Sequence, residues 1–153
     1  MSDKVLASAS GVNVGPLMAA HTVYVFFDMQ CPHCGHLWNA AKDLEGTVKF
    51  VWIPVGLLTP ASTAQGALLL SSVKGSDVLE KHEALLLAHK GGITVLGVAA
   101  TPGAGEKVAE NTRILKMMGS TSVPFLVSKR ANGTFGTATG ALSSSQLREF
   151  IAQ

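Results

Sequence analysis

Residues 22–34 read TVYVFFDMQCPHC, and this stretch contains the only two cysteines of the 153-residue chain. The apolar run from Thr22 to Phe27 predicts a buried strand, and the residues after Cys31 predict a helix. A Cys-x-x-Cys pair at a strand-to-helix turn is typical of a thiol–disulfide redox site. We therefore expect disulfide exchange chemistry at this turn.

Each residue of the motif Cys31-Pro32-His33-Cys34 has an expected role. Free N–H groups and the dipole at a helix N-terminus favour a thiolate, so Cys31 is the expected nucleophile. Pro32 suits the first helical turn, where its missing N–H costs nothing. Cys34 lies one turn further on, on the same side, and can attack the mixed disulfide formed at Cys31. His33, when protonated, adds a cation close to the thiolate.

Other uses of the cysteine pair are weaker interpretations. A structural disulfide is disfavoured because so short a loop removes little entropy from the unfolded chain. A c-type haem site requires His directly after the second Cys, where this chain has Gly35. A zinc site needs about four ligands. The candidates are Cys31, Cys34 and either His33 or His36, with His21, His82 or His89 as the fourth. No second pair at ligand spacing accompanies them, so we expect no metal and no organic cofactor. We expect His36, His82 and His89 at the surface or at helix ends.

Composition bounds the class of protein. A chain of 153 residues with 47% hydrophobic and 14% charged residues predicts one well-buried domain. A net charge of +2 is too small to indicate nucleic acid or an acidic membrane surface as a partner. No apolar run approaches the ~18 residues of a membrane span. No apolar segment of a signal peptide follows Met1, so the protein is either cytosolic or has lost a signal.

The pattern along the chain predicts an α/β domain. Strands are expected at 22–28 and 47–55 around a helix at 32–44, which makes a βαβ unit. The remaining expected elements are an arm or short leading strand in 1–20, a helical insertion at 56–105, a helix at 106–118, a hairpin of 125–129 with 134–138, and a C-terminal helix at 143–152.

This element order, with Cys-Pro-His-Cys after the first strand and Val123-Pro124 before the hairpin, resembles the thioredoxin-like fold, a central mixed sheet flanked by helices. The run from Val23 to Asp28, the cysteine motif and Trp38 resemble the catalytic domain of the periplasmic disulfide-bond (Dsb) family. Within that family, DsbG and DsbC are the similar members, with DsbG nearer. The resemblance covers roughly residues 20–152.

The resemblance implies a thiol–disulfide oxidoreductase acting on protein cysteines. It implies that Cys31 is the exposed attacking thiol and that Cys34 is the buried resolving thiol. It also implies a cis Val123–Pro124 peptide that faces the active site and pairs with the substrate backbone. The implied redox partner is a membrane protein of the DsbD type or the DsbB type. The implied location is the periplasm, after signal removal, in preference to the cytoplasm.

Two departures from DsbC and DsbG bear on function. Those proteins carry an N-terminal dimerisation domain and a linker helix, for which residues 1–20 are too short. We therefore expect residues 21–153 to form the catalytic domain of a monomer. Val123 and His33 stand where those isomerases usually have Thr and Tyr, a pairing that resembles the oxidant DsbA. The alternatives are a peptide- or protein-binding module with little redox turnover and a zinc-bound structural module.

Overall fold

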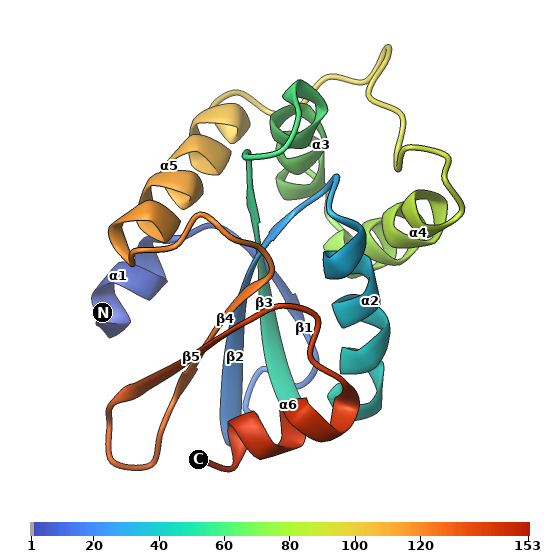
Figure 1. Cartoon of the computed structure of the whole chain (residues 1–153). Coiled ribbons are helices and arrows are strands. Elements are labelled where there is room, and N and C mark those ends of the chain that lie inside the picture. The colour runs from blue at the N-terminus through green and yellow to red at the C-terminus, as the bar shows by residue number, and fades with distance from the viewer. Residues whose placement is uncertain (1) are drawn as a thin grey trace.

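The computed structural model describes residues 2–153, in which a five-stranded sheet lies between two layers of helices (Figure 1). The strand order is β1-β3-β2-β4-β5, and only β2 and β3 pair in parallel among the described strands. The strands are β1 (Val12–Val14), β2 (His21–Asp28), β3 (Val48–Val55), β4 (Phe125–Lys129) and β5 (Phe135–Thr139). This mixed sheet agrees with the predicted fold class.

The βαβ unit forms as the sequence predicts. β2 pairs with β3 in parallel from His21 with Val48 to Asp28 with Val55. Between them lies α2 (Pro32–Ala41), which continues into a short 3-10 turn (Lys42–Leu44). The carboxyl end of β2 therefore leads directly into the cysteine motif, at the upper edge of the sheet in Figure 1.

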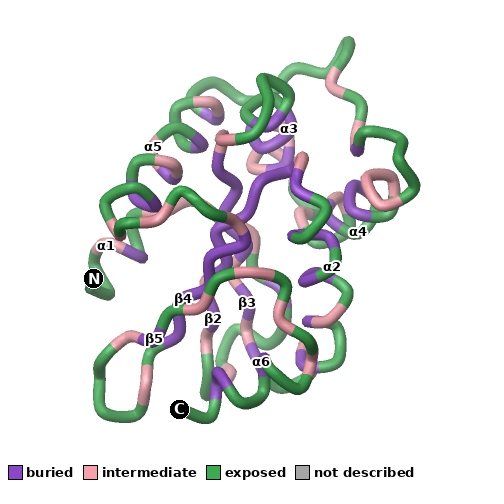
Figure 2. Tube along the Cα trace, in the orientation of Figure 1, coloured by how far each residue is buried: buried purple, intermediate pink, exposed green. Residues whose placement is uncertain are grey.

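Successive side chains of β2 point to opposite faces of the sheet, so the central strands build two cores. On one face Phe27 and Trp52 pack with side chains of α2, α4 (Gly75–Leu87) and α6 (Ser144–Ile151). On the other face Phe26 and Ile53 pack with side chains of α1 (Asp3–Ser8) and α5 (Ala104–Met117). Figure 2 shows buried residues concentrated along the central strands and on the inward sides of the helices.

The predicted insertion consists of two helices and a long connector. A capping box of Thr59 and Ser62 begins α3 (Pro60–Leu70), which packs on α5 and β3. The second helix, α4, begins at Gly75 and ends at Leu87. The connector from there to Ala104 contains no helix. The insertion places α4 against α2, so it flanks the cysteine motif (Figure 1).

The N-terminal region differs from the expectation. A strand around Val12 and Val14 is confirmed, but Leu17 lies outside it and is exposed. The helix α1 was not predicted, because six residues are too few to show a helical period. The Ser2 side chain caps this helix by accepting the Val5 N–H, and Leu6 is buried in the core.

The C-terminal elements follow the prediction closely. β4 and β5 form an antiparallel hairpin around Asn132-Gly133, and Gly133 has the positive φ that the turn requires. Ser143 and Gln146 form the capping box of α6. Within the described residues, every helix is too short or too polar to cross a membrane.

Candidate active site

Cys31 occupies the N-cap of α2. Its backbone is extended, with φ −94° and ψ 113°, and its Sγ accepts the N–H of Cys34 at 3.3 Å. A cap side chain that accepts one of the free N–H groups of the first turn stabilises the helix start. Pro32 follows in the first helical turn, where it needs no acceptor. The local sequence therefore holds the sulfur against the positive end of α2.

The two cysteines have opposite pKa shifts. The pKa of Cys31 falls to about 7, mainly because of a hydrogen bond from the Cys34 side chain and further because of the backbone N–H groups of Cys34 and His33. Burial and the charge of Asp28 act in the other direction. Burial raises the pKa of the Cys34 thiol well above its usual value. Near neutral pH Cys31 is thus partly ionised, and its thiolate lies beside a protonated thiol at Cys34.

The two cysteines are less exposed to solvent than the sequence led us to expect. Both residues are free cysteines, with 4% of Cys31 and none of Cys34 exposed. The Val123–Pro124 segment lies against Cys31, whose Sγ is 3.9 Å from the carbonyl oxygen of Val123. The Val123–Pro124 peptide bond is cis, as predicted. The expectation of an exposed Cys31 thus needs correction: a neighbouring loop leaves only a small part of this residue at the surface.

The histidines near the cysteine motif differ in exposure: two lie at the surface and one is buried. His33 and His36 are exposed on α2, with ring centroids 6.5 Å apart, and His33 contributes its backbone N–H to Cys31. His82 is completely buried, so its expected surface position is wrong. Its Nδ1 accepts the Ile93 N–H at 3.0 Å, and its Nε2 donates to the Met29 carbonyl at 2.5 Å. Buried polar groups are stable when paired in this way.

The structure supplies no ligand set for the zinc alternative. Across residues 2–153, no three Cys, His, Asp or Glu side chains gather where they could hold one metal ion. His82, one of the candidate fourth ligands, uses both ring nitrogens in hydrogen bonds within the fold.

Asp28 was not singled out from the sequence, yet it organises the loops beside the cysteines. Its Oδ1 accepts from the Gln30 N–H and the Ser62 hydroxyl, and its Oδ2 accepts the N–H groups of Leu57 and Leu58. These bonds, 2.6–3.0 Å long, tie the end of β2 to the loop after β3 and to α3. Asp28 is a positioning residue, and three of its four partners lie about thirty residues away in sequence.

Glu83 is a second residue that the sequence prediction missed. It lies on α4, is 1% exposed, and neither carboxyl oxygen has a hydrogen-bond partner among the described residues. Burial, reinforced by the charge of Cys31, raises its pKa to about 8. Its position four residues after Leu79, on the apolar face of the helix, was the available signal.

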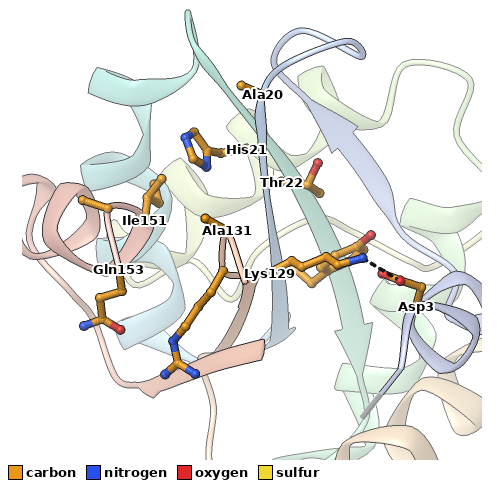
Figure 3. A pocket seen from close by; sticks show the side chains of 11 residues that line it. Asp3, Ala20, His21, Thr22, Lys129, Ala131, Ile151 and Gln153 are labelled. Carbon is orange, nitrogen blue, oxygen red and sulfur yellow. Dashed lines mark hydrogen bonds and ion pairs between the residues drawn. The ribbon is translucent and has the colours of Figure 1, made fainter. Parts of the chain in front are cut away.

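A surface hollow of about 610 Å³ lies far from this chemistry (Figure 3). His21, Thr22 and Lys129 are among its lining residues, and Lys129 pairs with Asp3 at 2.8 Å. His21 begins β2, whereas the cysteine motif follows the other end of this eight-residue strand, roughly 20 Å away at the rise of an extended chain. The hollow is therefore separate from the candidate active site.

Comparison with known proteins gives two curated relatives. The thiol:disulfide interchange protein DsbG of Pseudomonas aeruginosa is 32% identical over 136 residues, which cover 87% of this chain and 52% of that protein. DsbG of Escherichia coli K12 is 27% identical over 122 residues, covering 77% of this chain and 47% of that protein. The chain thus spans about half the length of the curated relatives it matches. No family model matches the chain.

The fold has close counterparts among solved structures. A periplasmic thioredoxin-like protein from Salmonella enterica serovar Typhimurium superposes with a TM-score of 0.79 at 13% identity, covering 99% of this chain and 95% of that one. The predicted thioredoxin-like fold and the resemblance to Dsb proteins are both confirmed.

Proposed function

We propose that this chain, which is similar to DsbG and has a thioredoxin-like fold, is a protein disulfide oxidoreductase acting on cysteines of other proteins. The observation that carries the proposal is the Cys31 sulfur at the N-cap of α2, where it accepts the Cys34 N–H at 3.3 Å. This position favours a thiolate next to a second thiol. The cysteine pair itself holds the electron pair, so the reaction as proposed requires no further redox group.

In the reducing direction, the Cys31 thiolate attacks one sulfur of a substrate disulfide and the other substrate sulfur leaves as a thiolate. Cys34 then loses its proton and attacks the Cys31 sulfur. The Cys31–Cys34 bond forms, the mixed disulfide breaks, and the second substrate sulfur leaves with its electron pair. In the oxidising direction, a substrate thiolate attacks the Cys31 sulfur of the oxidised pair, and Cys34 is the leaving group.

The residues around the pair have proposed supporting roles. Val123 and Pro124 would bind the substrate backbone, because they lie against the Cys31 sulfur from outside α2. Pro32 would start the helix without competing for an acceptor. His33 would add positive charge at the rim when protonated, since its side chain is exposed beside the motif.

We propose that the pair is a stronger oxidant than a dithiol whose two thiols have ordinary pKa values. A thiolate stabilised at Cys31 stabilises the reduced form, and a stable reduced form makes the disulfide a stronger oxidant. The equilibrium constant against glutathione measures this property directly.

The natural setting follows from the same proposal. The substrates would be cysteine-containing proteins in the periplasm, and a membrane protein of the DsbD or DsbB type would reset the pair. Residues 21–153, with the 56–105 insertion, would be the catalytic unit, and residues 1–20 would be an arm. The 153-residue chain would act as a monomer, which sedimentation measures.

The test is insulin reduction by the purified chain in the presence of a small thiol. We expect turnover by the natural chain and none by the Cys31→Ser variant. Peptide binding without turnover in the natural chain would instead favour the binding module. Thiol titration with and without a chelator separates the zinc module, because bound zinc would mask both thiols.

A further inference from the structure

The Glu83 carboxyl is a buried ionisable group near the cysteines that the proposed exchange steps do not use and that, within residues 2–153, has no hydrogen-bond partner. Its Oε2 lies against the first turns of α2, since a Cβ built on Gly35 would stand 2.8 Å from it. Gly35 directly follows Cys34, so the absence of a side chain there leaves room for the carboxyl against the turn of α2 that carries the resolving cysteine.

The surroundings of this carboxyl favour its protonated form at rest. Both oxygens are buried and unpartnered within residues 2–153. An isolated ionised carboxylate in such a place is very costly, so it holds a proton instead. A thiolate at Cys31 adds repulsion and favours that proton further.

Few other charged groups face Glu83. α2 contributes Cys34 and, at its N-cap, Cys31, while His33 and His36 on the same helix are exposed. The segments α3 and β1, which also pack on α4, contain no ionisable side chain. Asp28 lies near Cys31. On α4 itself, His82 is hydrogen-bonded within the core. Glu80 pairs with Lys42.

We propose that Glu83 is the proton-transfer partner of Cys34. When Cys31 is in a mixed disulfide it carries no charge and its repulsion of the Glu83 carboxylate ends, so the pKa of Glu83 falls and Glu83 releases its resting proton to solvent. The carboxylate then accepts the proton of the Cys34 thiol, and the Cys34 thiolate attacks the Cys31 sulfur as substrate leaves. In the opposite direction, the Glu83 carboxylic acid returns this proton to Cys34 as it leaves Cys31. This role rests on the proposed exchange reaction. It assigns the deprotonation of Cys34, which precedes resolution of the mixed disulfide, to a residue of the 56–105 insertion.

The kinetic test separates the two exchange steps. Reduced protein is mixed with oxidised glutathione, quenched with acid and analysed by mass spectrometry for the Cys31–glutathione mixed disulfide. Glu83→Gln should leave formation of this species within about twofold and slow its resolution by roughly 100-fold, the low end of general acid–base contributions. Glu83→Asp should recover part of the rate. The matched control Glu149→Gln, at an exposed position of α6, should behave as the natural chain.

The pH profile distinguishes proton transfer from a packing defect. Resolution in the natural chain should level off below about pH 8, because in the mixed disulfide Cys31 no longer raises the pKa of Glu83. In Glu83→Gln it should keep rising with pH, because only solvent then removes the proton. Equal resolution rates in the two proteins, or equal slowing of both steps, would overturn the role of Glu83. If the natural chain forms no mixed disulfide at all, the oxidoreductase proposal fails instead.

A spectroscopic measurement requires no turnover. Carbon-13 NMR of the labelled Glu83 carboxyl should give a titration midpoint near 8 in the reduced protein and a lower midpoint in the oxidised protein. A midpoint near 4.5, the ordinary value of a glutamate, in both forms would refute the coupling to Cys31.

Discussion

Removal of the Cys34 sulfur tests how α2 stabilises the Cys31 thiolate. In the natural chain the Cys34 side chain is the largest cause of the lowered Cys31 pKa, ahead of the backbone N–H groups. Cys34→Ala deletes this donor and keeps the backbone N–H at 3.3 Å. We therefore expect the Cys31 pKa to rise above about 7 but to stay below that of a free thiol.

The magnitude follows from the energy of one hydrogen bond. A hydrogen bond to a charged group contributes about 1.5–3 kcal/mol, and about 1.4 kcal/mol corresponds to one pKa unit. The midpoint of Cys31 ionisation should thus move upward by about one pH unit, the low end of this range, because the backbone N–H groups still stabilise the thiolate. At pH 7 the thiolate fraction would fall from about one half to about one tenth.

The assay is the rate of alkylation by iodoacetamide across pH, with the labelled site identified by mass spectrometry. The midpoint is the readout rather than the rate itself, because a thiolate of higher pKa is also about threefold more nucleophilic per unit. Cys31→Ser is the control and should show only slow labelling of buried Cys34. An unchanged midpoint in Cys34→Ala would refute the assigned role of its sulfur. A natural chain with a midpoint near ~8.5 would refute thiolate stabilisation altogether.

Three further predictions concern the exchange order and the buried carboxyls. Cys34→Ser should trap mixed disulfides through Cys31, while Cys31→Ser should trap none, as non-reducing gels with a disulfide substrate will show; trapping at Cys34 would reverse the assigned order. Asp28→Asn removes one acceptor oxygen and orphans buried donors, at about 1–3 kcal/mol each, so urea unfolding should show a loss of about 2 kcal/mol or more while exposed Asp77→Asn changes little. Glu83→Gln should gain stability relative to the natural chain as pH rises from 4.5 to about 8, because over this window the folded state holds a proton that the unfolded state has lost. The gain should reach about 3 kcal/mol between pH 4.5 and pH 7, and a pH-independent difference would show that Glu83 is ionised in the folded protein.

Local sequence patterns predicted the framework of this protein. The apolar run in β2, the helical spacing after Pro32 and the turn at Asn132-Gly133 each depend on residues close in sequence. Such short-range preferences are legible without knowledge of the fold. They also placed the two cysteines at the start of a helix, where the structure has them.

The sequence by itself determined that a Cys-x-x-Cys pair follows a buried strand in an α/β domain. Only the tertiary structure decided that little of Cys31 is exposed, that Asp28 binds the loop after β3 and α3, and that His82 and Glu83 are buried. The physical reason is that a polar side chain on a helix is exposed or buried according to what packs against that face. α4 packs on α2, and the Trp38–Glu80 hydrogen bond between them joins residues 42 positions apart in the chain. No local period of the sequence encodes that contact.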